Sequence, residues 1–266
     1  MVRFLSLSSG SNANCYYIGN GDGGLLIDLG VGVRTLKKRL AEHDISFDNI
    51  NMVLITHDHI DHIRSLGSFT ERYKKPVFAT ETLHKALHTH FCTRGSLSGC
   101  VNILEEDVCY RSGDIGITAF SVPHDATQTL GYHIDFEGVK FTFLTDMGHP
   151  TDKAVKYASK ANHLIVEANY DIDMLLRGPY AKSLKMRILE DTGHLSNDQT
   201  ASLVRRAFHP ELKSIHLAHL SKNNNTPKLA LHTVKEALCE IGVRVGEDVI
   251  LNCLPRTDSS DMMECS

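Results

Sequence analysis

Four side chains that can bind a metal ion lie within six consecutive positions of the sequence. They are His57, His59, Asp61 and His62. An apolar run at 52–55 precedes them, and such a run is typical of a strand buried in the middle of a sheet. Imidazole and carboxylate donors together suit Zn²⁺ or a related divalent ion. Because α/β sheets place their sites at the carboxyl ends of strands, the pattern predicts a metal site rather than a loop that is merely rich in histidine.

Three further donors stand directly after other apolar runs. Strands are predicted at 115–122, 139–144 and 214–217. The donors that follow them are His124, Asp146 and His219. In the last strand, the two-residue period places His219 on the same face as Leu217, which we expect to point inward, and His216 on the other face. All seven donors are therefore expected at the carboxyl ends of strands.

The elements that must position these donors follow from apolar periodicity and turn residues. Two strands are expected within 3–18 around a turn at 8–12, followed by a strand at 25–27 and a helix at 32–43. Further helices are expected between 62 and 76, at 83–90, at 196–208 and at 226–241, with a final strand at 249–254. His84 and His88 form an alternative metal pair at i, i+4. That pair is disfavoured because its helix lies far from any strand end.

Composition limits the class of protein. The 266 residues are 42% apolar and 23% charged, which is ordinary for a globular chain and excludes a disordered one. We expect one domain over 1–256 and a disordered polar tail over 257–266. No apolar run approaches the roughly 20 residues of a membrane span and no signal-peptide layout is present, so no membrane partner is expected. The seven cysteines include no CxxC pair and are expected to be reduced thiols of a cytoplasmic protein.

The net charge of −4 excludes a broad basic surface and leaves only local patches for a polyanion. The best candidate patch lies in the segment between Glu167 and His194. It consists of Arg177, Lys182, Lys185 and Arg187, with Lys222 as a further candidate. The alternative interpretation of these residues is a solvated loop and helix face.

The His-x-His-x-Asp-His run at 57–62 resembles the signature of the metallo-β-lactamase superfamily, and the later His, Asp and His occur in the order that this family requires. The resemblance implies an α/β fold, an αββα sandwich of two mixed sheets flanked by helices. It also implies two divalent metal ions, with Zn²⁺ expected and Mn²⁺ as the alternative. One ion would be held by His57, His59 and His124. The other would be held by Asp61, His62 and His219, with Asp146 bridging the two.

The same resemblance gives roles to two aspartates. Asp28 corresponds to the family's first motif, in which an aspartate braces the metal loop by hydrogen bonds; its alternative role is to cap the helix at 32–43.

Two ions about 3.5–4 Å apart can share a hydroxide, lower its pKa toward about 7 and clamp the attacking and leaving oxygens. Asp61 would orient this hydroxide. Two dications with two carboxylates and a hydroxide leave a net positive charge, which suits an anionic phosphodiester.

His194 and Glu167 are the remaining catalytic candidates. A capping box formed by Ser196 and Gln199 predicts that a helix begins beside His194. A positioned imidazole can protonate a leaving oxygen near neutral pH, and Glu167 would hold its tautomer. The runs Glu-Ala-x-Tyr, Gly-His-x-Ser and His-Leu-Ser resemble those of tRNase Z, on the nuclease side of the superfamily. The alternatives are that Glu167 is a surface carboxylate and that His194 is a neighbour of the helix cap.

Nearly the whole chain is similar to the YycJ/WalJ group of small bacterial proteins with this fold. The likeness lies in Ser-Ser-Gly-Ser-Asn-Ala at 8–13, Asn-Tyr-Asp at 169–171, Leu-Lys-Met-Arg-Ile at 184–188 and Gly-His-Leu-Ser-Asn at 193–197. It implies a cytoplasmic nuclease with a dinuclear metal site, a 5′-to-3′ DNA exonuclease, with DNA favoured over RNA as the partner.

The sequence differs from related nucleases in two ways, and two other functions remain as alternatives. The Gly-Pro-rich arm of the tRNA-processing enzymes is absent, so precursor-tRNA cleavage is not expected. The 73 positions from Asp146 to His219 leave no room for the inserted domain of the RNA exonucleases with this fold. The main alternative is a small-molecule phosphodiester or thioester hydrolase on the same metal core. A regulatory protein with a relict site is disfavoured, because no ligand is missing.

Overall fold

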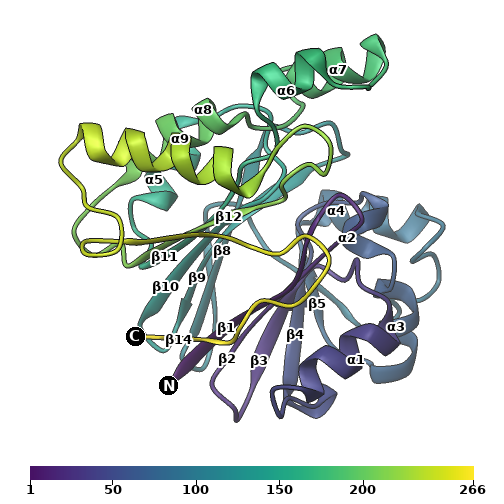
Figure 1. Cartoon of the computed structure of the whole chain (residues 1–266). Helices are drawn as coiled ribbons and strands as arrows, with labels where there is room; N and C mark the ends of the chain where they lie inside the picture. The colour runs from purple at the N-terminus through teal and green to yellow at the C-terminus, as the bar shows by residue number, and fades with distance from the viewer.

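Two seven-stranded sheets face each other in the computed structural model, which describes residues 1–266 (Figure 1). The first sheet contains β1 (Val2–Gly10), β2 (Ala13–Gly19), β3 (Gly24–Ile27), β4 (Ile50–Leu54), β5 (Val77–Ala79), β6 (Val101–Ile103) and β14 (Met263–Cys265). Across the sheet they run in the order β14-β1-β2-β3-β4-β5-β6. Pairing is antiparallel from β14 to β3 and parallel from β3 to β6, so this sheet is mixed.

The second sheet repeats this plan. It contains β7 (Cys109–Ser112), β8 (Ile115–Val122), β9 (Thr129–Phe136), β10 (Val139–Leu144), β11 (His163–Glu167), β12 (Ser214–Ala218) and β13 (Ile250–Cys253). Their order is β13-β12-β11-β10-β9-β8-β7. The strands from β10 to β13 are parallel, and those from β7 to β10 are antiparallel neighbours. The carboxyl ends of β8, β10, β11 and β12 therefore lie along one edge.

Helices cover the outer face of each sheet (Figure 1). On the side of the first sheet are α1 (Val33–Ala41), the short α2 (Ile60–Ile63), α3 (Leu66–Tyr73) and α4 (Glu81–Thr89). On the side of the second are α5 (Asp152–Ala158), α8 (Asn197–Ala207) and α9 (Pro227–Glu240). Two more helices, α6 (Ile172–Arg177) and α7 (Lys182–Leu189), project beyond the others at the top of the view. The layers form the αββα sandwich that the resemblance implies.

Aromatic rings fill the space between the two sheets. Phe4 and Tyr16 of the first sheet meet Phe143 of the second at ring-centroid distances of 6.1 and 5.6 Å. These rings belong to the larger apolar core, and a second core lies between the second sheet and α5, α8 and α9. Removal of this apolar area from water is the main force that holds the layers together.

The two faces of β12 are arranged differently from the sequence prediction. Ile215 and Leu217 pack in the outer core against the helices, so their row points away from the space between the sheets. His216 is fully buried on the opposite face, 5.6 Å from the ring of Phe4. His219 therefore does not reach the site by continuing the row of Leu217. It does so because the strand ends at Ala218 and the backbone turns there.

Several elements lie where the sequence predicted no strand or helix, among them β6, β9, α5, α6 and α7. β9 is a central strand, paired with β8 on one side and β10 on the other. It contains Gly131, where an added Cβ would lie 2.6 Å from the ring of Phe120, so glycine is required for this ring to cross the strand. The apolar residues at 130, 132, 134 and 136 do alternate as in a strand, but the interior glycine weakens the prediction.

The tail at 257–266, which was predicted to be disordered, contains β14. This strand pairs with β1, and the Ser260 backbone N–H donates to Ser6 O at 2.8 Å. Arg39 of α1 also donates to the carbonyl of Thr257. Backbone pairing, which a polar sequence does not reveal, orders the tail. All seven cysteines are free thiols, and none of the helices combines the length and apolar composition needed to cross a bilayer.

Candidate metal centre

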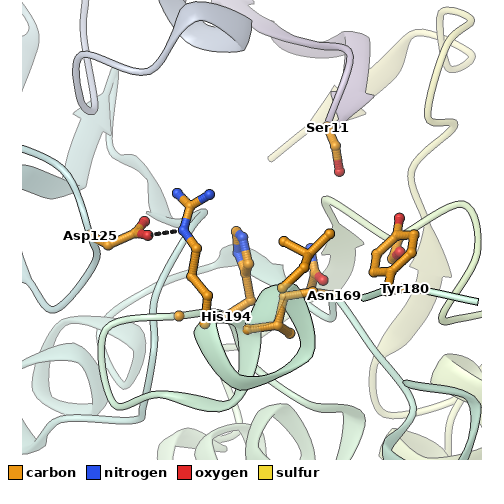
Figure 2. Close-up of a pocket in the computed structure, with 10 residues that line it drawn as sticks. Ser11, Asp125, Asn169, Tyr180 and His194 are labelled. Carbon is orange, nitrogen blue, oxygen red and sulfur yellow. Dashed lines mark hydrogen bonds and ion pairs between the residues drawn. The ribbon is translucent and has the colours of Figure 1, made fainter. Parts of the chain in front are cut away.

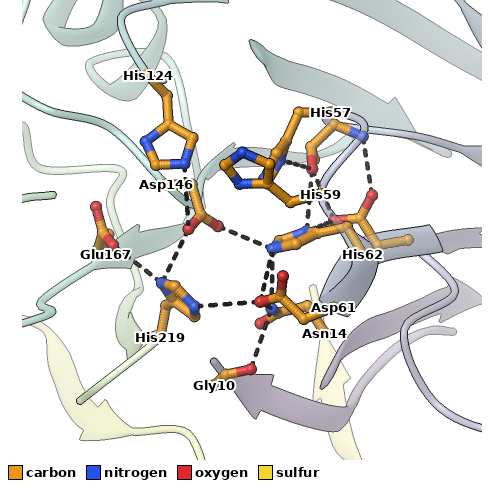
Figure 3. Close-up of polar contacts among 12 residues, drawn as sticks. Gly10, Asn14, His57, His59, Asp61, His62, His124, Asp146, Glu167 and His219 are labelled. Carbon is orange, nitrogen blue, oxygen red and sulfur yellow. Dashed lines mark hydrogen bonds and ion pairs between the residues drawn. The ribbon is translucent and has the colours of Figure 1, made fainter. Parts of the chain in front are cut away.

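The seven predicted metal ligands come together where the carboxyl ends of the strands of both sheets meet (Figure 3). His57 and His59 lie in the loop between β4 and α2, and Asp61 and His62 lie on α2, which follows this loop directly. The residues just after β8, β10 and β12 include His124, Asp146 and His219. A hydrogen bond from the His219 backbone N–H to Ser9 Oγ, at 3.0 Å, joins the two sheets at this point.

Three residues at strand ends in this region have left-handed backbone conformation. Asp28, Asp146 and His219 have φ values of 61°, 52° and 53°. This conformation costs a residue with a Cβ roughly 1–2 kcal/mol, although Asp and His tolerate it better than most. At each position it turns the chain as the strand ends and directs the side chain toward the centre. Such strain is typical of functional sites.

The donors form two groups that share a central carboxylate. Within each group the ligand atoms lie within 4.8 Å of one another; the groups are His57, His59 and His124, and Asp61, His62 and His219. Asp146 lies within the same distance of His57 and His62. Four buried atoms of this set have no hydrogen-bond partner in the chain: His57 Nε2, His124 Nε2, Asp146 Oδ2 and His219 Nε2. Buried polar atoms rarely lack partners, so these converging atoms fit divalent cations as their ligands.

Asp28 connects the two ligand groups: it bonds to His62 of the second group directly and to His57 of the first group through Thr56. Its Oδ2 accepts from His62 Nδ1–H at 2.7 Å and from the Thr56 hydroxyl at 2.8 Å. The Thr56 hydroxyl in turn lies 3.0 Å from His57 Nδ1 and accepts its proton. Nδ1 of both histidines is thereby occupied, so Nε2 is the nitrogen that faces the centre, which is the usual arrangement of metal-bound imidazoles. Asp28 makes the bracing contacts that the resemblance implies, and it does not cap α1.

Backbone carbonyls hold two other histidines. His124 Nδ1–H donates to Gly193 O at 2.8 Å, which leaves Nε2 for the centre. His59 Nε2 lies 3.2 Å from Asp125 O, so Nδ1 is its free ring nitrogen. The carbonyl contacts fix the tautomer and the ring orientation of each residue.

The centre combines buried carboxylates with histidines, and each shifts the pKa of the other. Burial acts to raise the pKa of Asp146, but His219 and His62 hold it well below its usual range. Burial likewise acts to lower the pKa of His219, but Asp146, Asp61 and Glu167 raise it to about 10. Burial, followed by the charge of His62, lowers the pKa of His57. Carboxylates that keep their charge at such depth attract cations to this point.

Glu167 and His194 form a pair beside the centre. His194 Nδ1–H donates to Glu167 Oε1 at 2.7 Å, and the same oxygen lies 3.0 Å from His219 Nδ1. Burial acts to raise the pKa of Glu167, but its contacts with His194 and His219 lower it to about 2. Glu167 is fully buried, which excludes the alternative of a surface carboxylate. One carboxylate thus orients both a proposed ligand and the proposed acid.

An open cavity of about 180 Å³ lies beside His194 (Figure 2). We call it the inner cavity; among the residues that line it are Ser11, Asn169, Tyr180, Arg187 and His194. The dashed line in Figure 2 marks the ion pair of Arg187 with Asp125, the residue after the proposed ligand His124. The inner cavity gives a substrate access to His194, and this ion pair ties α7 to its rim.

Sequence reasoning missed two polar residues that contact the donors. Asn14 is fully buried, and its Nδ2 lies 2.9 Å from His62 Nε2 and 3.3 Å from Asp61 Oδ2. Asp125 Oδ1 lies 3.4 Å from His124 Nε2. Asn14 stands in a run interpreted as turn and strand, so no local pattern could reveal it. Asp125 follows a predicted ligand directly, and that adjacency was the available signal.

The predicted basic patch is largely occupied by contacts within the chain. Lys185 Nζ donates to Leu176 O at 2.7 Å, and Arg187 pairs with Asp125. Arg177 lies 4.0 Å from Asp173. The alternative metal pair is also engaged, since His84 Nε2 contacts Asn102 O at 2.9 Å.

A model of the Beta-lactamase superfamily domain matches residues 24–217. The chain belongs to this superfamily. Six of the seven donors lie inside the matched region, and His219 lies just beyond it. The superfamily assignment agrees with the sandwich fold and with the divalent-metal donor set described above.

Two relatives match nearly the whole chain. Exodeoxyribonuclease WalJ of Streptococcus pneumoniae serotype 2 (strain D39 / NCTC 7466) is 34% identical over 246 residues, which are 92% of this chain and 91% of that protein. Exodeoxyribonuclease YycJ of Bacillus anthracis is 33% identical over 246 residues, 92% of each chain. Among solved structures, the metallo-β-lactamase fold protein YhfI of Bacillus subtilis covers 97% of this chain and 98% of its own, with a TM-score of 0.71 and 16% identity. At that identity the structural likeness concerns the fold alone.

Proposed function

We propose that this protein is a metal-dependent exodeoxyribonuclease that hydrolyses phosphodiester bonds of DNA. The observation that carries the proposal is a full donor set beside an oriented histidine, His194, which faces an open cavity. Two relatives that match more than nine-tenths of the chain and bear the name exodeoxyribonuclease support it. DNA is favoured over RNA for the same reason. We also propose the 5′-to-3′ direction and a cytoplasmic location, which the sequence resemblance implies.

We infer that the site holds two divalent ions, Zn²⁺ first and Mn²⁺ as the alternative. His57, His59 and His124 would hold one, because three neutral imidazoles suit Zn²⁺. Asp61, His62 and His219 would hold the other. Asp146 suits the bridging position, since its Oδ2 lies 3.1 Å from His62 Nε2 and its Oδ1 lies 4.0 Å from His124 Nε2. When bound, two such ions supply an activated water and a charge clamp on the phosphate oxygens.

The residues of the chain supply the orientation and the proton. Asp61, whose side chain is 18% exposed at the open side of the centre, orients the attacking water. His194 uses Nδ1 to contact Glu167, so Nε2 is the atom that donates a proton to the leaving oxygen. Glu167 keeps His194 in this tautomer and orientation. The scissile phosphate would therefore lie between Asp61 and His194.

The decisive experiment is a digest of end-labelled single-stranded DNA beside RNA, bis-nitrophenyl phosphate and a thioester, after chelation and reconstitution with Zn²⁺ or Mn²⁺. We expect DNA to be shortened from its 5′ end in a metal-dependent reaction, with RNA cut more slowly. Products that begin at the 3′ end would reject the proposed direction. Hydrolysis of the small substrates without any cleavage of DNA or RNA would favour the small-molecule hydrolase instead.

Metal content tests the dinuclear site directly. We expect elemental analysis of the reconstituted protein to find two ions per chain. At most one ion after full reconstitution would contradict the division of ligands proposed above.

A further inference from the structure

A second cavity lies directly beside the inner cavity. We call it the outer cavity; its volume is about 370 Å³, and it shares Ser11 and Tyr180 with the inner cavity. Segments far apart in the sequence build it, namely the turn between β1 and β2, the loop after β12 and the chain after β13. The loop after β12 contains the proposed ligand His219, three residues before Lys222. The outer cavity therefore adjoins the metal centre.

The walls of the outer cavity are polar and positively charged. Its polar lining consists of Ser11, Asn12, Tyr180, Lys222, Asn223, Arg256 and Thr257, and no carboxylate lines it. An anion that enters would meet two cations and several hydrogen-bond donors without any like charge. The chain as a whole has a net charge of −4, so the positive charge of this cavity is a local feature.

Neither cation is neutralised by the protein. The side chains of Lys222 and Arg256 take part in no ion pair or hydrogen bond within the chain, in contrast to Lys185 and Arg187 of the predicted patch. Arg256 is half-buried, and its Cβ lies 3.2 Å from the position of a Cβ at Gly10, so its stem packs on the β1–β2 turn. A guanidinium and an ammonium that are held near a cavity without partners suit a phosphate group, which both can contact through charge-assisted hydrogen bonds.

Tyr180 stands at the junction of the two cavities. Asn223 Nδ2 donates to the Tyr180 hydroxyl at 3.3 Å, which ties the ring to the loop after β12. Aromatic rings in nucleic-acid channels stack on bases without regard to sequence. A nucleotide whose phosphates lie in the two cavities would carry its base past this ring.

We propose that the outer cavity is a phosphate subsite, in which Lys222 and Arg256 bind the backbone phosphate next to the scissile one. The proposal rests on the proposed function, because it takes the scissile phosphate to lie at the metal centre. A terminal 5′-phosphate and an internal phosphodiester present the same chemistry to these two cations. A small diester has only one phosphate and therefore gains nothing from the subsite.

The test compares the double variant Lys222→Gln/Arg256→Gln with the unaltered enzyme on single-stranded DNA and on bis-nitrophenyl phosphate. We expect KM for DNA to rise roughly tenfold or more, since a hydrogen bond to a charged group is worth about 1.5–3 kcal/mol. The salt dependence should flatten by about 1.4 in log–log slope, because each phosphate contact on a single strand contributes about 0.7. The rate on the small diester should stay within about twofold, because that substrate makes neither contact.

Two control variants separate the subsite from general charge. Arg111→Gln/Lys235→Gln removes the same charge from exposed positions on β7 and α9 and should leave KM unchanged. Lys222→Arg/Arg256→Lys keeps both charges and should retain most of the affinity. Substrates with a 5′-phosphate or a 5′-hydroxyl identify the source. A loss confined to the phosphorylated strand assigns the subsite to the terminal phosphate, and an equal loss assigns it to an internal one.

Failure of the subsite and failure of the proposed function give different results. If the enzyme cuts DNA and the double variant does so with unchanged KM and salt slope, the subsite is rejected and the function stands. If the small diester suffers as much as DNA, the two residues are structural and the subsite is again rejected. Binding of a labelled strand in the presence of chelator is measured in parallel. If no polynucleotide is cut, the proposed function fails, and equal strand affinity of the two proteins would then reject the subsite as well.

Discussion

The metal centre and the outer cavity differ in how their charged side chains are held. In the centre, His62 is bonded to Asp28 and His219 to Glu167, so a buried carboxylate fixes the orientation of each imidazole. In the outer cavity, Lys222 and Arg256 have no partner in the chain. A displacement of about 1 Å at reacting groups can cost about 10²-fold in rate, whereas counterion release requires only cations that are free to exchange partners. The comparison indicates that the fold fixes the side chains that act at the scissile bond. The side chains that bind the DNA backbone are left without partners in the protein.

The largest effect is expected from Asp61→Asn, which tests the metal centre, where the side chains are held in place. Asp61 Oδ2 lies 3.6 Å from His62 Nε2 and 3.8 Å from His219 Nε2, so its charge belongs to the second donor group. Loss of several kcal/mol of transition-state stabilisation predicts a rate about 10³-fold lower or worse, on DNA and small diester alike. Asp58→Asn, in the same loop, is the control. A near-normal rate in the folded Asp61 variant would show that this carboxylate neither binds metal nor orients the nucleophile.

His194→Ala should give the next largest effect, and one that depends on the substrate. Loss of the acid predicts a rate lower by about 10²–10⁴-fold on DNA, with a much smaller loss on bis-nitrophenyl phosphate, whose leaving group needs no proton. Metal content should be unchanged, because the hydrogen bond of His194 goes to Glu167 and His194 is not one of the proposed ligands, although its Nδ1 lies 3.6 Å from Asp146 Oδ1. His232→Ala on α9 is the surface control. Equal losses on both substrates would instead assign His194 to phosphate binding.

Asp28→Asn should weaken metal binding, and it should also lower stability, because both Asp28 oxygens accept buried hydrogen bonds and an amide nitrogen cannot. Loss of the charged partner of His62 is expected to weaken metal binding about 10–100-fold, as measured by competition with a chelator. Asparagine tolerates left-handed backbone, so the φ of 61° is not disturbed. Asp44→Asn is the matched control, because Asp44 has a similar φ of 58° on the surface. Unchanged metal affinity would mean that the brace does not contribute to the centre.

Tyr180→Leu should give the smallest effect and is specific to polynucleotides. Loss of one stacked base predicts weaker binding of single-stranded DNA by about 1–3 kcal/mol, with no change on a small diester. Tyr110→Leu, at an exposed tyrosine of β7, is the control. If Tyr180→Leu leaves strand affinity intact, the ring does not contact a base, and the outer cavity must act through its cations alone.

Strand-end patterns were sufficient to select the donors, because each donor is local to an apolar run. His57 to His62 follow β4, and Asp146 follows β10, so the structure brings together residues that short windows of sequence had singled out. The prediction for His219 was wrong because it extended the two-residue strand period beyond the end of β12. His219 lies beyond β12, and its left-handed φ, rather than the face of Leu217, directs it to the centre.

Sequence by itself determined the order of the donors along the chain, the capping box of α8, and the absence of a broad basic surface. These features depend on residues that are neighbours in the sequence or on the total number of charged residues. Tertiary structure alone decided that Asn14 touches Asp61 and His62, and that Arg187 pairs with Asp125. It also built the outer cavity from segments near 11, 222 and 256. Such contacts join residues tens to hundreds of positions apart, and no local pattern records which charges find partners once the sheets have packed.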